Sequence, residues 1–215
     1  MKKYYLLPLF LLFLTISFSQ KKKKNSDDVL KASDLSGLKF RSVGPAFMSG
    51  RIADIAINPE NENEWYVAVG SGGVWKTINS GTTWNPITDD QSFYSTGCIT
   101  IDPNNSSKIW LGTGENVGGR HVGIGHGIYV SENGGKNWKS MGLKSSEHIS
   151  KIIVSPNDSN VVFVASQGPL WSSGGERGLF KTNDGGKSWN NVLSVNQWTG
   201  GTEIAIDNEN PNILY

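Results

Sequence analysis

The chain has 215 residues, among them 26 glycines, eight tryptophans and one cysteine, and 18% of its residues are charged. This composition is typical of a globular β-rich protein and excludes a disordered or collagen-like chain. Outside the six lysines at positions 2–3 and 21–24, 14 basic residues face 19 acidic ones, which gives a net charge of −5. A nucleic acid partner is therefore not expected, because phosphate binding requires a basic surface.

Residues 1–19 have the pattern of a secretory signal peptide. A short basic start is followed by an apolar run over Tyr4–Phe18 and by small residues at 17–19. The run is short and is interrupted by Pro8, which disfavours a membrane span; an uncleaved anchor is the alternative. We expect a secreted, periplasmic or cell-surface protein whose mature chain starts near Gln20, with no stable membrane anchor after cleavage.

Residues 20–39 form a polar leader, and residues 40–215 carry a repeated pattern of short apolar strands. The first strand of each repeat ends in an Asn, Asp or Ser turn, and an aromatic residue recurs nine positions after the last apolar residue of that strand. The lone Cys98 cannot form an internal disulfide and is expected to be a buried small hydrophobe. The first strands are expected at 52–57, 98–101, 149–154 and 203–206, and the recurrent aromatics are Tyr66, Trp110, Phe163 and Tyr215.

The clearest repeated motif is a turn, Ser/Thr-x-Asp/Asn-x-Gly-x-x-Trp, that occurs three times before a short fourth strand. Its third residue can hydrogen-bond the nearby backbone, its glycine supplies a positive φ, and its tryptophan re-enters the sheet as an apolar anchor. We interpret these residues as structural. The copies are Thr77, Asn79, Gly81 and Trp84; Ser131, Asn133, Gly135 and Trp138; and Thr182, Asp184, Gly186 and Trp189.

Four short strands per repeat, at a spacing near fifty residues, predict an all-β fold, a β-propeller of four-stranded antiparallel blades. Because the sequence stops within a fourth repeat and a propeller closes with about 4 to 8 blades, we expect an incomplete N-terminal fragment of about three and a half blades. Nearly all variation in repeat length falls between the second and third strands. These connections should share one face with the links between blades, opposite the turn motifs, and such a variable face is often the binding face.

The turn motif resembles the Asp box, or BNR repeat, of sialidase-like and sortilin-like (Vps10-type) propellers, and the resemblance covers residues 40–215. Two copies carry Asn where the Asp box has Asp. The opening segment 40–52 resembles large exported bacterial proteins of this class, which are often labelled glycosyl hydrolases by similarity to xyloglucanase-type propellers. The resemblance implies a propeller that binds a peptide, protein or glycan, although a fold by itself does not fix a function.

The catalytic residues of these families are not matched in the sequence. Xyloglucanase-type propellers, which the first repeat resembles, place a catalytic carboxylate in an Asp-x-Gly-Gly segment, and here residues 70–73 read Gly-Ser-Gly-Gly. Glycoside hydrolysis normally requires a pair of acids. Sialidases begin an arginine cluster in a Phe-Arg-Ile-Pro segment, and residues 40–43 read Phe-Arg-Ser-Val. No catalytic residue is assigned; the alternative is a glycoside hydrolase with carboxylates supplied partly by blades outside this sequence.

The ligand-binding candidates all lie in connections on the expected variable face. Trp171 and Trp198 are not explained by the repeat pattern, and they are suited either to stack on sugar rings and anchor a peptide or to cap the core. Segments 112–126 and 166–177 add acids, arginines and histidines among many glycines. The candidates are Glu115, Arg120, His121, His126, Trp171, Glu176, Arg177 and Trp198.

The same segments do not indicate a metal or a cofactor. The spacing of Glu115, His121 and His126 fits no common ligand pattern, and the glycines of 112–119 lack the Lys-Ser/Thr of a phosphate loop. Arg51 and Glu203, at the starts of first strands, are expected to pair with charges on neighbouring blades. The leading hypothesis is an exported propeller that binds a peptide, protein or carbohydrate through its variable face; a purely structural scaffold is a further alternative.

Overall fold

The computed structural model describes residues 31–38, 50–119, 121–207 and 209–215. It divides into two compact units, Met1–Phe47 and Met48–Tyr215. The described part of the first unit contains a short 3-10 helix, η1 (Ala32–Leu35). The predicted signal peptide lies outside the described residues, and in the described ranges no helix has both the length and the apolar character needed to cross a membrane.

The second unit contains three four-stranded antiparallel sheets, in each of which the strands pair in chain order. The first sheet has β1 (Ile52–Ile57), β2 (Trp65–Val69), β3 (Gly73–Thr77) and β4 (Asn85–Pro86). The second has β5 (Thr96–Asp102), β6 (Asn105–Thr113), β7 (Ile128–Ser131) and β8 (Lys139–Ser140), and the third has β9 (Ile149–Ser155), β10 (Asp158–Ser166), β11 (Gly178–Thr182) and β12 (Asn190–Leu193). A 3-10 turn, η2 (Lys144–Ser146), links the last two sheets.

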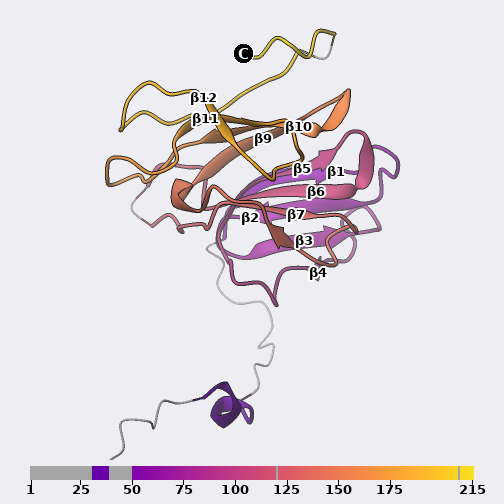
Figure 1. Ribbon diagram of the computed structural model, residues 1–215. Coiled ribbons are helices and arrows are strands. Elements are labelled where there is room, and N and C mark those ends of the chain that lie inside the picture. The colour runs from indigo at the N-terminus through magenta and orange to yellow at the C-terminus, as the bar shows by residue number, and fades with distance from the viewer. Residues whose placement is uncertain (1–30, 39–49, 120, 208) are drawn as a thin grey trace, which may run out of the picture. The chain divides into compact units, whose positions relative to one another are not determined.

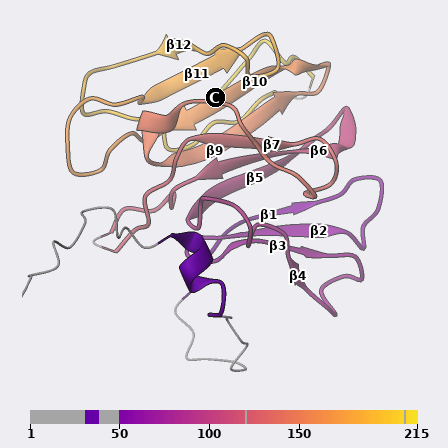
Figure 2. The same ribbon diagram turned by 60° about the horizontal axis from the view of Figure 1, so that its bottom comes forward.

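The sheets stack face to face in chain order, and the first strand of each sheet lies beside the first strand of the next (Figures 1 and 2). Four-stranded meanders stacked in this way are propeller blades, so the predicted fold class is confirmed. Each sheet is short and alternates β-branched or aromatic residues with polar turns, which is why the repeat pattern identifies it.

The chain begins a fourth sheet after β12. Ile206 and Leu214 form an isolated antiparallel bridge, and the backbone amides of Ala205 and Tyr215 each donate to the other's carbonyl oxygen, at 3.0 and 2.9 Å. The strand expected at 203–206 is thus reduced to a single bridge. A lone pair of strands is marginal without a third strand beside it or a covering layer.

Apolar cores lie between successive sheets. The core between the first two sheets includes Tyr66 and Ile109, and the core between the second and third includes Trp110 and Val164. A smaller core, centred on Phe163, joins the third sheet to the fourth segment. The recurrent second-strand aromatics therefore hold equivalent places, and Cys98 is buried, as expected.

The three turn motifs form the same hydrogen bonds. In the third copy the Thr182 hydroxyl donates to the Asp184 carboxylate at 2.6 Å, and the Gly186 amide donates to the Thr182 hydroxyl at 3.0 Å. The copies with Asn in place of Asp keep both bonds. The motif glycines have φ between 85° and 87°, a conformation that residues with a Cβ rarely adopt.

The motif tryptophans pack on the preceding sheet where one is present. The indole N–H of Trp138 donates to the carbonyl oxygen of Ile87 at 3.3 Å, and that of Trp189 donates to Met141 at 2.7 Å. Each acceptor stands three residues after the motif tryptophan of the preceding sheet. Trp84 differs because no described sheet precedes its own, and it packs instead near Trp65, with ring centroids 6.4 Å apart.

Candidate functional site

The variable connections and the links between sheets lie at one end of the blades, which we call the loop face (70–72, 87–95, 114–127, 141–148, 167–177 and 194–203). Backbone amides of the connections donate to carbonyl oxygens of the links, from Gly73 to Tyr94, from Gly125 to Glu147 and from Gly174 to Gln197. The two long connections also touch, because Nε2 of Gln167 donates to the carbonyl oxygen of Asn116 at 2.8 Å. The prediction that they share one face is confirmed.

Glu115 follows β6 and directs its carboxylate toward the first sheet. Nη2 of Arg51 donates to both carboxylate oxygens, at 2.6 Å to Oε2, and the Ser71 hydroxyl donates to Oε1 at 3.1 Å. Glu115 is 1% exposed, so its carboxylate is a buried member of an ion pair between sheets. Arg51 therefore pairs as expected, and so does Glu203, whose carboxylate lies 3.8 Å from Nζ of Lys151.

Glu115 occupies the space beside Gly70, the position where the resembling xyloglucanases carry Asp. A Cβ at position 70 would lie 2.6 Å from Oε1 of Glu115, which is too close for an unshifted side chain. An aspartate at position 70 and the present Glu115 rotamer therefore exclude each other. The carboxylate found at this place on the loop face comes from the second blade and already has two donors.

His148 extends the same cluster toward the third sheet. Its Nδ1–H donates to the backbone carbonyl oxygen of Glu115 at 2.9 Å. Burial lowers the pKa of the imidazole below its ordinary value, so the ring is uncharged at neutral pH. The sequence analysis misses His148, although it stands six residues before the last apolar residue of its strand, the position that Arg51 holds in the first repeat.

Arg177 is buried and holds several loop-face segments together. Its Nε donates to the carbonyl oxygen of Gly174 at 2.7 Å and its Nη1 to that of Trp198 at 2.8 Å. Its Nη2 donates to the carbonyl oxygens of Pro169 and Ser172, both at 2.9 Å. A guanidinium with four carbonyl partners fixes the backbone around it. A ligand contact by Arg177 stays a prediction; the contacts within the chain are those of a positioning residue.

Glu176, beside Arg177, also has partners within the chain. Its Oε2 accepts hydrogen bonds from the backbone amide and the hydroxyl of Ser145, both at 2.9 Å. The carboxylate thereby joins the third blade's connection to the preceding link. A role for Glu176 in ligand binding is not tested by these contacts.

Trp171 and Trp198 project from the two segments that Arg177 joins. Their side chains are 74% and 62% exposed, so they do not cap the core. A shallow cavity of about 200 Å³ adjoins them. Its lining residues are Gln167, Pro169, Leu170, Arg177, Trp198, Gly200 and Thr202. Two exposed indoles beside a small polar cavity form the most distinctive surface on the described part of the loop face.

The remaining candidates lie in the second blade's connection. His121 and His126 are exposed, and the backbone amide of His126 donates to the Thr113 hydroxyl at 2.7 Å. Arg120 lies outside the described residues. In the ranges that the structure describes, no group of three or more His, Cys, Asp or Glu side chains is arranged to hold a metal ion.

Comparisons with known proteins give weak sequence similarity to xyloglucanases. The chain is 25% identical over 108 residues to a probable oligoxyloglucan-reducing end-specific xyloglucanase of Neosartorya fischeri, a match that covers 48% of this chain and 12% of that protein. It is 21% identical over 153 residues to the oligoxyloglucan-reducing end-specific xyloglucanase of Emericella nidulans, covering 69% of this chain and 18% of that protein. The chain thus spans less than a fifth of the length of these relatives. No family model matches it.

Solved structures show the same fold. The GH74 enzyme of Niastella koreensis superposes with a TM-score of 0.59 at 20% identity, covering 74% of this chain and 24% of that protein. The GH74 xyloglucanase of Xanthomonas campestris superposes with a TM-score of 0.55 at 15% identity, covering 74% and 25%. At these identities the likeness establishes a propeller fold and leaves the activity open.

Proposed function

We propose that this propeller binds a carbohydrate through its loop face, with Trp171 and Trp198 as the contact surface. The observation that carries the proposal is the exposure of two indoles on segments that Arg177 joins by hydrogen bonds. An exposed indole is a large, rigid apolar surface, and the C–H faces of sugar rings are flat and apolar in turn. Holding both indoles on one framework reduces the entropy lost on binding.

The groups around the indoles favour an uncharged sugar. Gln167 and Thr202 line the adjoining cavity and offer amide and hydroxyl groups to sugar hydroxyls. Arg177, which also lines the cavity, already donates to four carbonyl oxygens. The net charge of −5 outside the N-terminal lysines disfavours polyanionic glycans.

The comparisons support a carbohydrate over a peptide or protein ligand. Both curated relatives are named as xyloglucanases, enzymes that act on a glycan. The notebook of candidate surfaces on the described residues is otherwise equally suited to a peptide, since exposed tryptophans also anchor peptides. A peptide or protein is therefore the competing outcome of the binding test.

A glycoside hydrolase is the second candidate, favoured by the same similarity. Hydrolysis normally needs two carboxyl groups flanking the scissile bond. In the described residues Glu115 is buried in an ion pair and Glu176 is bonded to Ser145, so neither is free to act as it stands. For this reason we place binding before hydrolysis.

Titration calorimetry with xyloglucan oligosaccharides, cello-oligosaccharides and a random peptide library tests the proposal. We expect W171A and W198A each to weaken oligosaccharide binding about tenfold, a loss of about 1.4 kcal/mol. The matched control is I78A, which removes an exposed apolar side chain from the turn motif at the opposite end. Equal affinity of all three variants, or binding to peptides alone, contradicts the proposal.

The hydrolase candidate has a separate readout. Release of reducing ends from xyloglucan by the purified protein, abolished in E115Q, would replace binding by catalysis as the function. Binding without release supports the first proposal.

We further propose that binding takes place outside the cytoplasm, because residues 1–19 read as a signal peptide. Mass spectrometry of the protein recovered from a secreting host should show an N-terminus near Gln20. A protein retained with an intact Met1 would contradict export by cleavage.

A further inference from the structure

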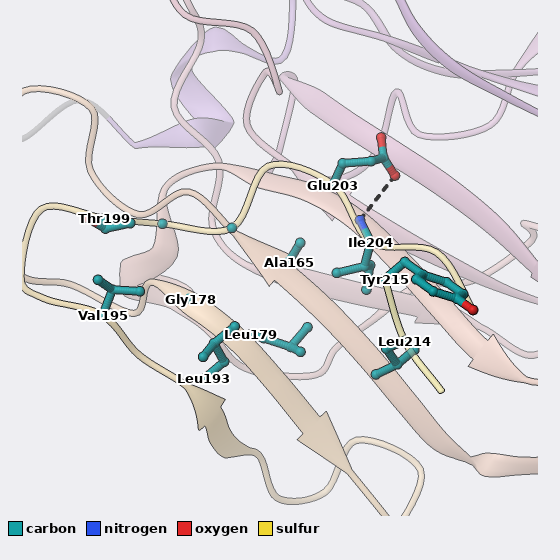
Figure 3. A pocket seen from close by; sticks show the side chains of 12 residues that line it. Ala165, Gly178, Leu179, Leu193, Val195, Thr199, Glu203, Ile204, Leu214 and Tyr215 are labelled. Carbon is teal, nitrogen blue, oxygen red and sulfur yellow. Dashed lines mark hydrogen bonds between the residues drawn. The ribbon is translucent and has the colours of Figure 1, made fainter. Parts of the chain in front are cut away.

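The third blade carries an apolar groove on the side facing away from the second blade. The groove has a volume of about 220 Å³ and lies between β11, β12 and the fourth segment. Figure 3 shows Leu179 and Leu193 on one side of it and Ile204, Leu214 and Tyr215 on the other. Its surface is mostly carbon, in contrast to the polar turns around it.

The corresponding faces of the first and second blades are covered, and the cover is the same in both. On the first blade it includes the link residue Phe93, the third-strand aromatic Tyr129 and the motif tryptophan Trp138. On the second blade it includes Leu143, Phe180 and Trp189 in the same roles. Each cover ends in an indole N–H bonded to the carbonyl oxygen three residues after the preceding motif tryptophan.

On the third blade the underlying half of this interface is present without its cover. The link residue Val195 is 68% exposed, whereas Phe93 and Leu143 are each 4% exposed. The residue three positions after Trp189 is Val192, which is also exposed. The core beneath is correspondingly small and has Phe163 at its centre.

A close approach at the motif glycine completes the pattern. A Cβ at Gly135 would lie 2.5 Å from the side chain of Ile87, and a Cβ at Gly186 would lie 2.9 Å from the ring of Trp110. The turn of each blade therefore packs directly on the preceding blade and requires glycine. The same two places on the third blade belong to Val192 and Phe163.

We propose that the groove is the docking surface for a β-hairpin of the turn-motif type, supplied by polypeptide that continues the fourth sheet. Its first strand carries a large aromatic residue at the place of Tyr129 and Phe180. Its turn glycine packs on Phe163, and its tryptophan donates an indole hydrogen bond to the carbonyl oxygen of Val192. The argument is continuity with the two interfaces already formed in the molecule, and it does not rest on the proposed function.

The test uses the full chain with a short extension. Tyr215 corresponds to Tyr66 in the repeat, so a copy of residues 67–87 appended to Tyr215 completes a fourth blade with the shortest connection that the chain contains. We expect the extended chain to bind less of the dye ANS and to melt about 5 °C or more above the original chain. Its added indole N–H should join those of Trp138 and Trp189 in slow hydrogen exchange.

The matched control is the same extension with its copies of Trp75 and Trp84 changed to alanine. This control should show none of the three effects. If the two extended chains behave alike, the groove does not select such a hairpin and the proposal is wrong.

A second variant guards against an extension that fails to fold for other reasons. L193K should leave the melting temperature of the original chain unchanged, because Leu193 is exposed there, and should abolish the gain in the extended chain. A loss of stability in the original chain would overturn the assignment of the groove as open. A concentration-dependent dimer of the original chain that L193K disperses would make a second copy the occupant and overturn the proposal.

Discussion

The two ends of the blades are built on different principles. At the turn end, three copies of one motif form the same hydrogen bonds, and replacing Asp184 by its counterparts Asn79 and Asn133 leaves the pattern intact. At the loop end, no two blades share their contacts. The first two blades are joined there by an ion pair of Arg51 and Glu115, and the third has its own hub at Arg177.

The difference separates structural from functional hypotheses. Contacts repeated in every blade serve what the blades have in common, which is folding and packing. Contacts present in a single blade are free to differ, and the exposed tryptophans are found among them. Variants at the two ends should therefore affect stability and binding in opposite proportions.

The largest effect on stability is expected from W189A at the turn end. Trp189 packs at 6.3 Å from Trp110 and bonds to Met141, so truncation should cost about 3–5 kcal/mol of unfolding free energy. W84A should cost clearly less, since Trp84 has no such acceptor on a described preceding sheet. Urea unfolding of both variants measures the difference; equal losses would contradict the blade-on-blade role of the motif tryptophan.

A coupled effect is expected at the loop end from G70A and E115A. The new Cβ of G70A meets the Glu115 carboxylate and should displace it from Arg51, at a cost of about 1–3 kcal/mol. In the double variant the obstacle is gone, so the loss should be smaller than the sum of the two single losses by about 1 kcal/mol or more. Additive losses would show that Gly70 and Glu115 do not compete for the same space.

A smaller effect, confined to acidic pH, is expected from D184N. Hydrogen bonds from the Ser188 hydroxyl, the Thr182 hydroxyl and the Ser188 amide hold the pKa of Asp184 well below its ordinary value of 3.8. A lowered folded pKa adds stability that is present above pH 4 and is lost as the pH falls through the folded value. D184N should therefore flatten the decline of Tm below pH 4 and leave its pH dependence between 5 and 8 unchanged.

The smallest effect on stability is expected from W171A. Because the indole is largely exposed, the unfolding free energy should change by no more than about 0.5 kcal/mol. The same variant should lose about tenfold in oligosaccharide affinity, as proposed above. A large loss of stability would assign Trp171 to packing and remove it from the binding surface.

Much of the loop face could not be predicted from the sequence because its contacts join residues far apart in the chain. The analysis names Glu115 and Arg177 as ligand candidates, and the structure shows both committed to partners within the chain, 64 residues away for Arg51 and 21 for Trp198. It misses His148, which is recognisable only when repeats are compared position by position. The exposure of Trp171 and Trp198 was open between two interpretations, and burial decides it.

The sequence by itself determined the strands, the turns, their repetition and the face on which length varies, because these depend on local periodicity and on turn residues within a few positions. Tertiary structure alone decided which charges are paired, which tryptophans meet solvent and which blade face stays uncovered. Those outcomes depend on which side chains of separate blades approach one another, and a linear pattern does not contain that information.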